Sequence, residues 1–354
     1  MMQIQAPPLQ RLVAAIFSAV GSHDDEAAAV AARLVGANLV GHDSHGVIRV
    51  PSYVSWVRDG KVKPNQQIEV LVDGDVMAIL DGRQGFGQVI GEQAMRLGIE
   101  KARDRGVAVI ALRNSAHLGR IGDWAVMAAE AGLISLHFVN TNGSGILVAP
   151  TGGIQRRLSA NPIAAGAPTP DGPPIILDIS TCAIAEGKIR VALNRGDQTP
   201  ENSIIDAEGK PTTDPNVFYG TPPGAILPFG AHKGYGLGVL VEVLAGALTG
   251  NGCSNPKNAG RLCQGMLTVL LDPAAFQQDD VFQNEIRQFI KFVKSSKTTT
   301  PDGIIMMPGE IEERTKAQRR QQGIPLDETT WEQLMQVCRS LEISQEQVDA
   351  MMAG

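Results

Sequence analysis

Residues 88–139 read QVIGEQAMRLGIEKARDRGVAVIALRNSAHLGRIGDWAVMAAEAGLISLHFV, and their periodicity sets the fold class. Apolar residues recur with the helical period over 88–105 and 121–131, whereas 107–112 are all apolar and 133–139 are apolar apart from Ser135 and His137. Helices that alternate with apolar strands are typical of an α/β protein whose helices cover both faces of the sheet. We therefore predict an α/β fold with a mostly parallel or mixed sheet covered by helices.

The rest of the chain extends this pattern in both directions. Residues 8–60 are predicted to be helical, and 70–81 to form a strand or hairpin. Turn-forming residues over 140–174 indicate loops at a cleft, and a strand follows at 175–179. Later elements are a long apolar helix that begins near His232, a strand over 265–271 and a helical tail beyond Glu310.

Composition restricts the class of function. The chain has 354 residues, a net charge of −6, 43% hydrophobic and 19% charged residues. This acidic balance argues against a nucleic-acid partner. The apolar segment 234–250 contains Glu242, so we expect a buried helix and no membrane contact. The four cysteines are scattered without the spacing of a zinc site, which favours a reducing compartment such as the cytoplasm and predicts no bound metal.

The pentapeptide His42-Asp43-Ser44-His45-Gly46, followed by Arg49, carries the strongest chemical signal. Histidine can exchange a proton near neutral pH, and arginine matches a carboxylate with two parallel hydrogen bonds. The alternative is a polar turn between two helices. A second cluster, Asn114-Ser115-Ala116-His117-Leu118-Gly119-Arg120, follows a predicted strand and favours the chemical interpretation.

Three further polar segments follow strands or open a helix. Asp178, Ile179 and Ser180 end a predicted strand, and Glu186-Gly187-Lys188 comes shortly after. His232 and Lys233 open the most apolar helix, while Pro308-Gly309-Glu310 is a lone turn. By contrast, the glycines at 85, 87 and 91 do not have the spacing of a dinucleotide-binding loop, and no acidic residue ends the following strand. If the protein binds a nucleotide, it therefore does so without a glycine-rich loop of this kind.

Taken in order, the motifs GHDSHGVIR, NSAHLGRIG, ANPIA, LDIST with GK, HKGYGL and PGE resemble the malate/L-lactate dehydrogenase family, which is unrelated to the Rossmann-type lactate dehydrogenases. The resemblance covers about residues 8–340 and is greatest for the bacterial hydroxycarboxylate dehydrogenase B branch. It implies a non-Rossmann NAD(P)-binding fold and a homodimer. It also implies that residues 1–75 join the helices of 310–354 on the substrate and dimer side, with 76–309 forming the NAD(P)-binding domain.

The resemblance also assigns roles to residues. It places Ser44, His45 and His117 at the catalytic site and Arg49 on the substrate carboxylate. In the family's cyclic imino-acid reductases an aspartate matches Lys188; the lysine here points to a hydroxy acid enzyme, in which it would add positive potential. The implied nucleotide contacts come from all of the polar segments above: His45, Gly119, Arg120, Ile121, Asp178, Ile179, Ser180, His232, Lys233, Pro308, Gly309 and Glu310.

These observations predict reversible hydride transfer between the nicotinamide of NAD or NADP, with NAD favoured, and C2 of a small 2-hydroxy or 2-oxo acid. The hydroxyl proton then needs an acid or base, and either His117 or His45 can supply it. An imine reductase of the same superfamily is the main alternative. A silent nucleotide-binding protein conflicts with the presence of His45, His117 and Arg49, and a metal hydrolase lacks a third ligand motif.

Overall fold

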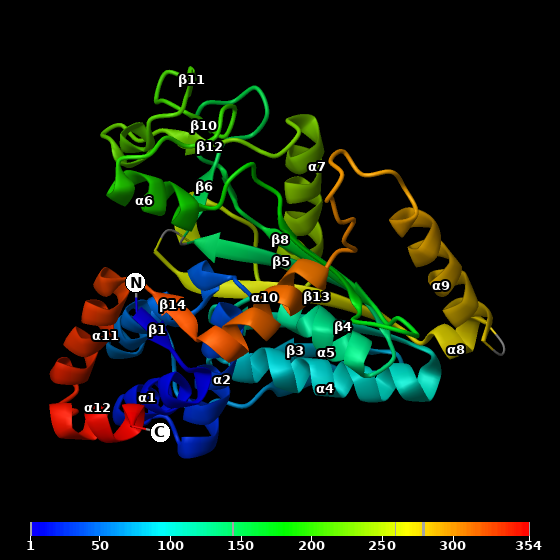
Figure 1. The fold of residues 1–354 in the computed structure, drawn as a ribbon, viewed down its shortest axis with the longest axis horizontal. Helices are drawn as coiled ribbons and strands as arrows, with labels where there is room; N and C mark the ends of the chain where they lie inside the picture. The colour runs from blue at the N-terminus through cyan, green and yellow to red at the C-terminus, as the bar shows by residue number, and fades with distance from the viewer. Residues whose placement is uncertain (1, 144, 259, 278–279, 354) are drawn as a thin grey trace.

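A seven-stranded mixed sheet forms the centre of the molecule (Figure 1). The computed structural model describes residues 2–143, 145–258, 260–277 and 280–353. Of the neighbouring strand pairs in this sheet, β3 and β4 are parallel and the other five pairs are antiparallel. Across the sheet, the strands occur in the order β2 (Glu69–Asp73), β3 (Met77–Asp81), β4 (Val107–Ser115), β13 (Leu262–Leu271), β5 (Ile134–Gly143), β8 (Pro162–Ala167) and β9 (Ile175–Ser180).

The α/β class with a mixed, helix-covered sheet is confirmed, whereas the expectation of a mostly parallel sheet is wrong. Strands β4 and β5 do run in the same direction, as the helix between them predicts. They are not neighbours, because β13 lies between them and is antiparallel to both. Strand β13 comes from a distant part of the chain, so the local alternation of helix and strand could not reveal its place.

Helices cover both faces of the sheet. On one face lie α4 (Gly87–Arg105) and α5 (Gly122–Glu130), and on the other α7 (His232–Val241) with its π-helical continuation Glu242–Ala247. The expected buried helix over 234–250 is buried on its sheet side only, since Val243 is 51% and Leu248 63% exposed. Among the described residues, no helix has the length and apolarity needed to cross a bilayer.

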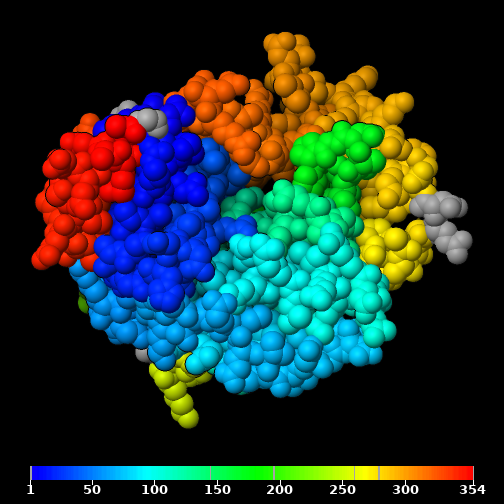
Figure 2. All heavy atoms as spheres, turned by 90° about the horizontal axis from the view of Figure 1, so that it is seen from below, coloured from blue at the N-terminus to red at the C-terminus, as the bar shows by residue number. Residues whose placement is uncertain are grey.

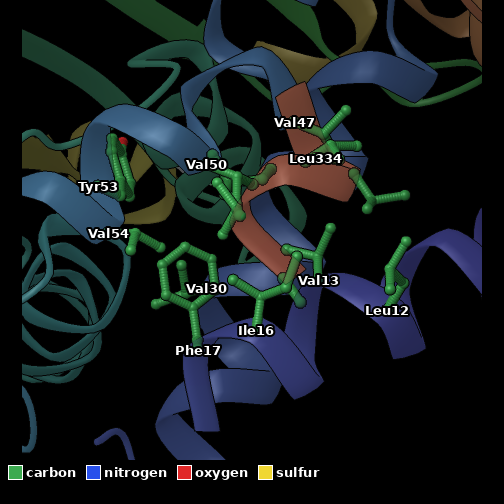
Figure 3. Close-up of a cluster of buried hydrophobic side chains, with 14 of the residues drawn as sticks. Leu12, Val13, Ile16, Phe17, Val30, Val47, Val50, Tyr53, Val54 and Leu334 are labelled. Carbon is green, nitrogen blue, oxygen red and sulfur yellow. The ribbon is translucent and has the colours of Figure 1, made fainter. Parts of the chain in front are cut away.

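The two ends of the chain pack together around one apolar cluster (Figures 2 and 3). The cluster contains Leu12, Ile16 and Phe17 from the N-terminal helix and Leu334 from the C-terminal part of the chain. Strand β1 (Met2–Ile4) also pairs with β14 (Ile324–Leu326). The proposed division into 1–75 plus 310–354 and 76–309 stays a prediction. The elements of this region are β1 (Met2–Ile4), α1 (Ala6–Ala19), α2 (Asp24–Leu39), two 3-10 turns (Asp43–His45 and Val47–Arg49), α3 (Val50–Arg58), β14 (Ile324–Leu326), α11 (Glu328–Ser340) and α12 (Gln345–Met352).

Several shorter elements surround the central sheet. The segment 140–174, predicted to be loops, contains three strands, and the six-residue β8 is built from Pro, Ile, Ala and Gly, which are mostly poor strand formers. A second sheet has the strand order β11 (Pro211–Thr212), β10 (Ile204–Ile205), β12 (Ala225–Ile226), β6 (Ile146–Val148) and β7 (Leu158–Ser159). The remaining elements are α6 (Glu186–Arg195), a 3-10 turn (Pro215–Tyr219), a 3-10 turn (Pro256–Asn258), α8 (Pro273–Phe276), α9 (Val281–Lys294) and α10 (Glu310–Gln322).

Candidate active site

The first candidate cluster forms the two 3-10 turns between α2 and α3. Asn38, buried near the end of α2, fixes both turns: its Nδ2 donates to Asp43 Oδ1 at 2.6 Å, and its Oδ1 accepts from the Val47 backbone N–H at 2.8 Å. A Cβ at Gly46 would lie 2.2 Å from Asn38 Oδ1, so only glycine fits there. The local chain is therefore held tightly, with Ser44 and His45 on one turn and Arg49 at the end of the next.

The two candidate clusters meet in space. The rings of His45 and His117 are stacked, with centroids 5.7 Å apart and planes 12° from parallel. Ser44 Oγ lies 3.1 Å from His45 Nδ1, and Arg49 Nε donates to the Ser44 carbonyl at 2.6 Å. The structure thus brings four of the predicted site residues together: two histidines, the serine and the arginine.

His117 lies in the loop that follows β4, and two neighbours hold this loop. The Leu118 backbone N–H donates to Gln264 Oε1 on β13 at 2.7 Å. Gly87, the first residue of α4, lies so close that a Cβ there would be 2.2 Å from the His117 carbonyl oxygen. The place of His117 therefore depends on β13, which enters the sheet beside β4, and on a glycine at the start of α4.

Two site residues were missed from the sequence. Tyr53 Oη lies 2.6 Å from His117 Nδ1, and Gln88 Nε2 donates to the same oxygen at 2.8 Å. Tyr53 stands four residues after Arg49, a spacing that places two residues on the same face of a helix. That spacing could have identified Tyr53, whereas nothing in the sequence singles out Gln88.

Burial and positive charge keep both histidines neutral. Burial, and then Arg49, His42 and Arg120, lower the pKa of His45 to about 3. Burial, Arg49 and His45 hold the pKa of His117 well below its usual value. Burial also raises the pKa of Tyr53 to about 12. Arg49 and Arg120 thus place positive charge beside the two neutral rings, which suits the site to an anionic ligand.

Lys188 lies near Ser44 and His45, but its side chain makes no polar contact with either of them. It is exposed in the first turn of α6, and its side chain makes no polar contact with the described residues. The start of α6 does lie against the 3-10 turn Asp43–His45, since a Cβ at Gly187 would be 3.3 Å from Ser44 Cβ. The predicted electrostatic role of Lys188 stays a prediction.

Three of the predicted nucleotide-binding segments converge on one another. The Gly122 backbone N–H donates to Asp178 Oδ2 at 2.9 Å, and Arg120 Nη1 lies 2.8 Å from Asp123 Oδ1. The Ile176 backbone N–H donates to the Pro308 carbonyl at 3.0 Å, which joins the Pro308–Glu310 turn to β9.

Two of these segments, through Arg120 and Gly309, line a pocket of about 220 Å³ between α2, α5, the start of β9 and α10, whereas Asp178–Ser180 lie outside its lining. Arg120 lines it while remaining 5% exposed; its Nε is buried and makes no hydrogen bond among the described residues, although it lies 3.7 Å from Asp178 Oδ2. The pocket is lined by Ala32, Arg33, Gly36, Leu39, Val40, Arg120, Asp123, Val126, Glu130, Pro174, Ile176, Gly309, Glu312, Glu313 and Lys316.

The fourth predicted nucleotide-binding segment, His232 with Lys233, opens α7 beside the end of β9. A Cβ at Gly234 would lie 2.4 Å from the Thr181 carbonyl oxygen, which places this helix start directly after Ser180. Both His232 and Lys233 are exposed. They therefore lie at the surface near the end of β9, the strand that carries Asp178, and they do not line the pocket.

Comparison with known proteins agrees with this architecture. Residues 4–335 match the family model described as malate/L-lactate dehydrogenase. The chain belongs to the malate/L-lactate dehydrogenase family. This membership confirms the predicted resemblance and identifies an oxidoreductase of the hydroxy acid dehydrogenase class.

Relatives in the malate/L-lactate dehydrogenase family are similar over almost their whole length. Hydroxycarboxylate dehydrogenase B of Escherichia coli O157:H7 is 38% identical over 352 residues, 98% of this chain and 97% of that protein. An L-lactate dehydrogenase of Cupriavidus necator is 36% identical over 97% of this chain and 99% of its own.

Solved structures extend the comparison. A malate/lactate dehydrogenase structure from E. coli has a TM-score of 0.95 at 38% identity, covering 99% of this chain and 98% of that one. A delta1-piperideine-2-carboxylate reductase from Pseudomonas syringae has a TM-score of 0.81 at 31% identity, covering 95% and 100%. The family's fold therefore accommodates both hydroxy acid dehydrogenases and an imino-acid reductase.

Proposed function

We propose that this protein transfers a hydride reversibly between NAD(P) and C2 of a small 2-hydroxy or 2-oxo acid. The observation that carries the proposal is the stacked pair of neutral histidines beside Arg49. Arg49 would bind the substrate carboxylate, and a neutral histidine would exchange a proton with the oxygen on C2. Ser44 would orient His45 through its hydrogen bond to Nδ1.

The described residues fit a nicotinamide dinucleotide. The pocket is lined by Arg120 and Gly309, from two of the segments predicted to contact the nucleotide, and Arg120 Nε, which makes no hydrogen bond among the described residues, offers a buried donor. Gly119 to Ile121, Asp178 to Ser180 and Pro308 to Glu310 would hold the nucleotide, with His45, His232 and Lys233 completing the contacts. When bound, the nicotinamide supplies or accepts the hydride.

NAD is proposed in preference to NADP. A 2′-phosphate is commonly received by a free arginine, whereas an acidic side chain accepts the 2′-hydroxyl. Each cation that lines the pocket already has a carboxylate partner among the described residues: Arg33 with Glu92, Arg120 with Asp123, and Lys316 with Glu313.

The homodimer is proposed from the resemblance together with exposed apolar surface. Helix α9 lies at the edge of the molecule (Figure 1), and Phe289 and Phe292 on it are 53% and 77% exposed. Val243 and Leu248, after α7, are exposed as well. A second copy of the chain is the proposed occupant of this surface. The four cysteines are free, which suits the proposed cytoplasmic location.

The experiment follows absorbance of the reduced nicotinamide with purified protein and either NADH or NADPH. The panel contains 2-oxo acids with different side chains and one cyclic imino acid. Oxidation of NADH with 2-oxo acids alone is the expected result, and a preference for NADPH would reverse the cofactor assignment. Turnover of the imino acid alone would favour the reductase alternative, which has a structural relative in the family.

A further inference from the structure

Tyr53 links the site to the protein interior. It is 1% exposed, and its ring contacts the rings of Phe17, Trp56 and Phe86. Its hydroxyl has two hydrogen-bond partners, Gln88 Nε2 at 2.8 Å and His117 Nδ1 at 2.6 Å. The position of its hydroxyl is therefore fixed by both packing and hydrogen bonds.

The direction of these bonds decides which nitrogen of His117 carries the proton. A phenol has one proton to donate, and a neutral imidazole has one N–H and one acceptor nitrogen. Because Gln88 Nε2 donates to the Tyr53 oxygen and the buried phenol has no other hydrogen-bond partner among the described residues, His117 Nδ1 is the acceptor available to the phenol proton. Nδ1 is then the acceptor, and Nε2 carries the ring proton. Reversing the Gln88 amide would reverse both assignments, so the two arrangements are mutually exclusive.

His117 Nε2 is open to a substrate. It makes no hydrogen bond within the part of the chain that the structure describes, and it is not among the fully buried unpartnered atoms. On the stacked ring, His45 Nε2 likewise makes no hydrogen bond among the described residues, and the two rings differ in the neighbour of Nδ1, which is Tyr53 for His117 and Ser44 for His45. An N–H on His117 Nε2 is thus a free donor beside Arg49, whose charge contributes to the low pKa of this ring.

We propose that Tyr53, oriented by Gln88, fixes His117 in the tautomer protonated on Nε2 and makes His117 the histidine that protonates the substrate oxygen. This inference rests on the proposed function and resolves the choice between His45 and His117. As C2 receives the hydride, the Nε2–H bond breaks and an O–H bond forms on the substrate. The Tyr53 proton moves to Nδ1 at the same time, so the ring stays neutral.

The two proton transfers conserve charge, and their direction agrees with the acidities of the groups. The negative charge passes from the forming alkoxide to the Tyr53 oxygen, which keeps the hydrogen bond donated by Gln88. Burial raises the pKa of Tyr53 to about 12, yet an aliphatic alcohol is a weaker acid still. After the product leaves, water returns a proton at Nε2 and the phenol recovers its own from Nδ1.

The test combines ring signals with kinetics in Tyr53→Phe. The chain has six histidines, so the signals of ¹⁵N-labelled His117 can be assigned by comparison with His117→Ala. We expect the wild-type ring to carry its proton on Nε2, and Tyr53→Phe to lose this preference. Turnover should fall about 10²-fold, within the usual range for a general acid, with KM for the 2-oxo acid changed by less than about twofold.

Thr268→Val is the matched control, because Thr268 Oγ1 forms a similar bond, 3.0 Å from Nδ1 of the buried His137. It should alter only the His137 signals and leave turnover unchanged. A wild-type proton on Nδ1 of His117, or a Tyr53→Phe protein with unchanged tautomer and turnover, would overturn the inference. A wild-type protein inert with every 2-oxo acid would refute the proposed function, while the ring signals would still decide the tautomer.

Discussion

Replacing Gly87 with alanine should displace His117 without removing any catalytic group. The new Cβ would lie 2.2 Å from the His117 carbonyl oxygen and 2.6 Å from Leu118 Cα. Both are backbone atoms that cannot rotate away. Ordinary contact begins near 3.4 Å, so the loop or the start of α4 must move by about 1.2 Å. A misplacement of about 1 Å can cost about 10²-fold in rate, and the overlap itself about 1–3 kcal/mol in stability.

The assay measures turnover of a 2-oxo acid with reduced nicotinamide, together with urea unfolding, for Gly87→Ala and Gly98→Ala. Gly98 is on the same helix, and a Cβ there would meet Leu270 Cδ1 at 2.5 Å and Ile110 Cγ1 at 2.8 Å, away from His117. Both variants should lose stability, but Gly98→Ala should keep turnover within about twofold because its disturbance is local. Equal losses of turnover in both variants, or full turnover in Gly87→Ala, would refute the reasoning.

Three other predictions concern single side chains. His117→Ala should lower turnover by about 10²–10⁴-fold in the reductive direction, and unchanged turnover would remove His117 from the mechanism. Arg49→Lys should raise KM for the 2-oxo acid, because a lysine cannot form two parallel hydrogen bonds to a carboxylate; an unaltered KM would place the carboxylate elsewhere. Burial lowers the pKa of the fully buried His137 to about 3. Below pH 6.5 the unfolded chain therefore binds more protons at this residue than the folded chain does, and the free energy of unfolding decreases as the pH is lowered. The wild type should lose about 2 kcal/mol between pH 7 and pH 5 from this group, a loss that urea unfolding should find missing in His137→Gln.

Local sequence patterns predicted the elements of this fold better than their arrangement. The periodicity over 88–139 identified two helices and two strands close to their observed bounds. It did not predict the insertion of β13, because strand order depends on contacts between distant residues. Strand β8 was missed since Pro162–Ala167 lacks the branched and aromatic residues that favour strands.

For the site, the sequence identified the chemically distinctive residues but not the residues that position them. Ser44, His45, Arg49 and His117 were singled out by residue type, and the structure places them together. Gln88 was not, because a buried glutamine has no chemistry that marks it in a sequence. Its role follows from the hydrogen bond to Tyr53, which itself depends on how α3 packs beside the start of α4.

The measurement that tests the proposed chemistry most directly follows the hydride itself. NADH carrying deuterium at the transferable C4 position is incubated with the protein and the 2-oxo acid that it turns over fastest. We predict deuterium at C2 of a 2-hydroxy acid, observed by NMR and mass spectrometry, with its rate of appearance reduced in His117→Ala. A product without deuterium at C2, or deuterium delivered only to a cyclic imino acid, would contradict the proposed function.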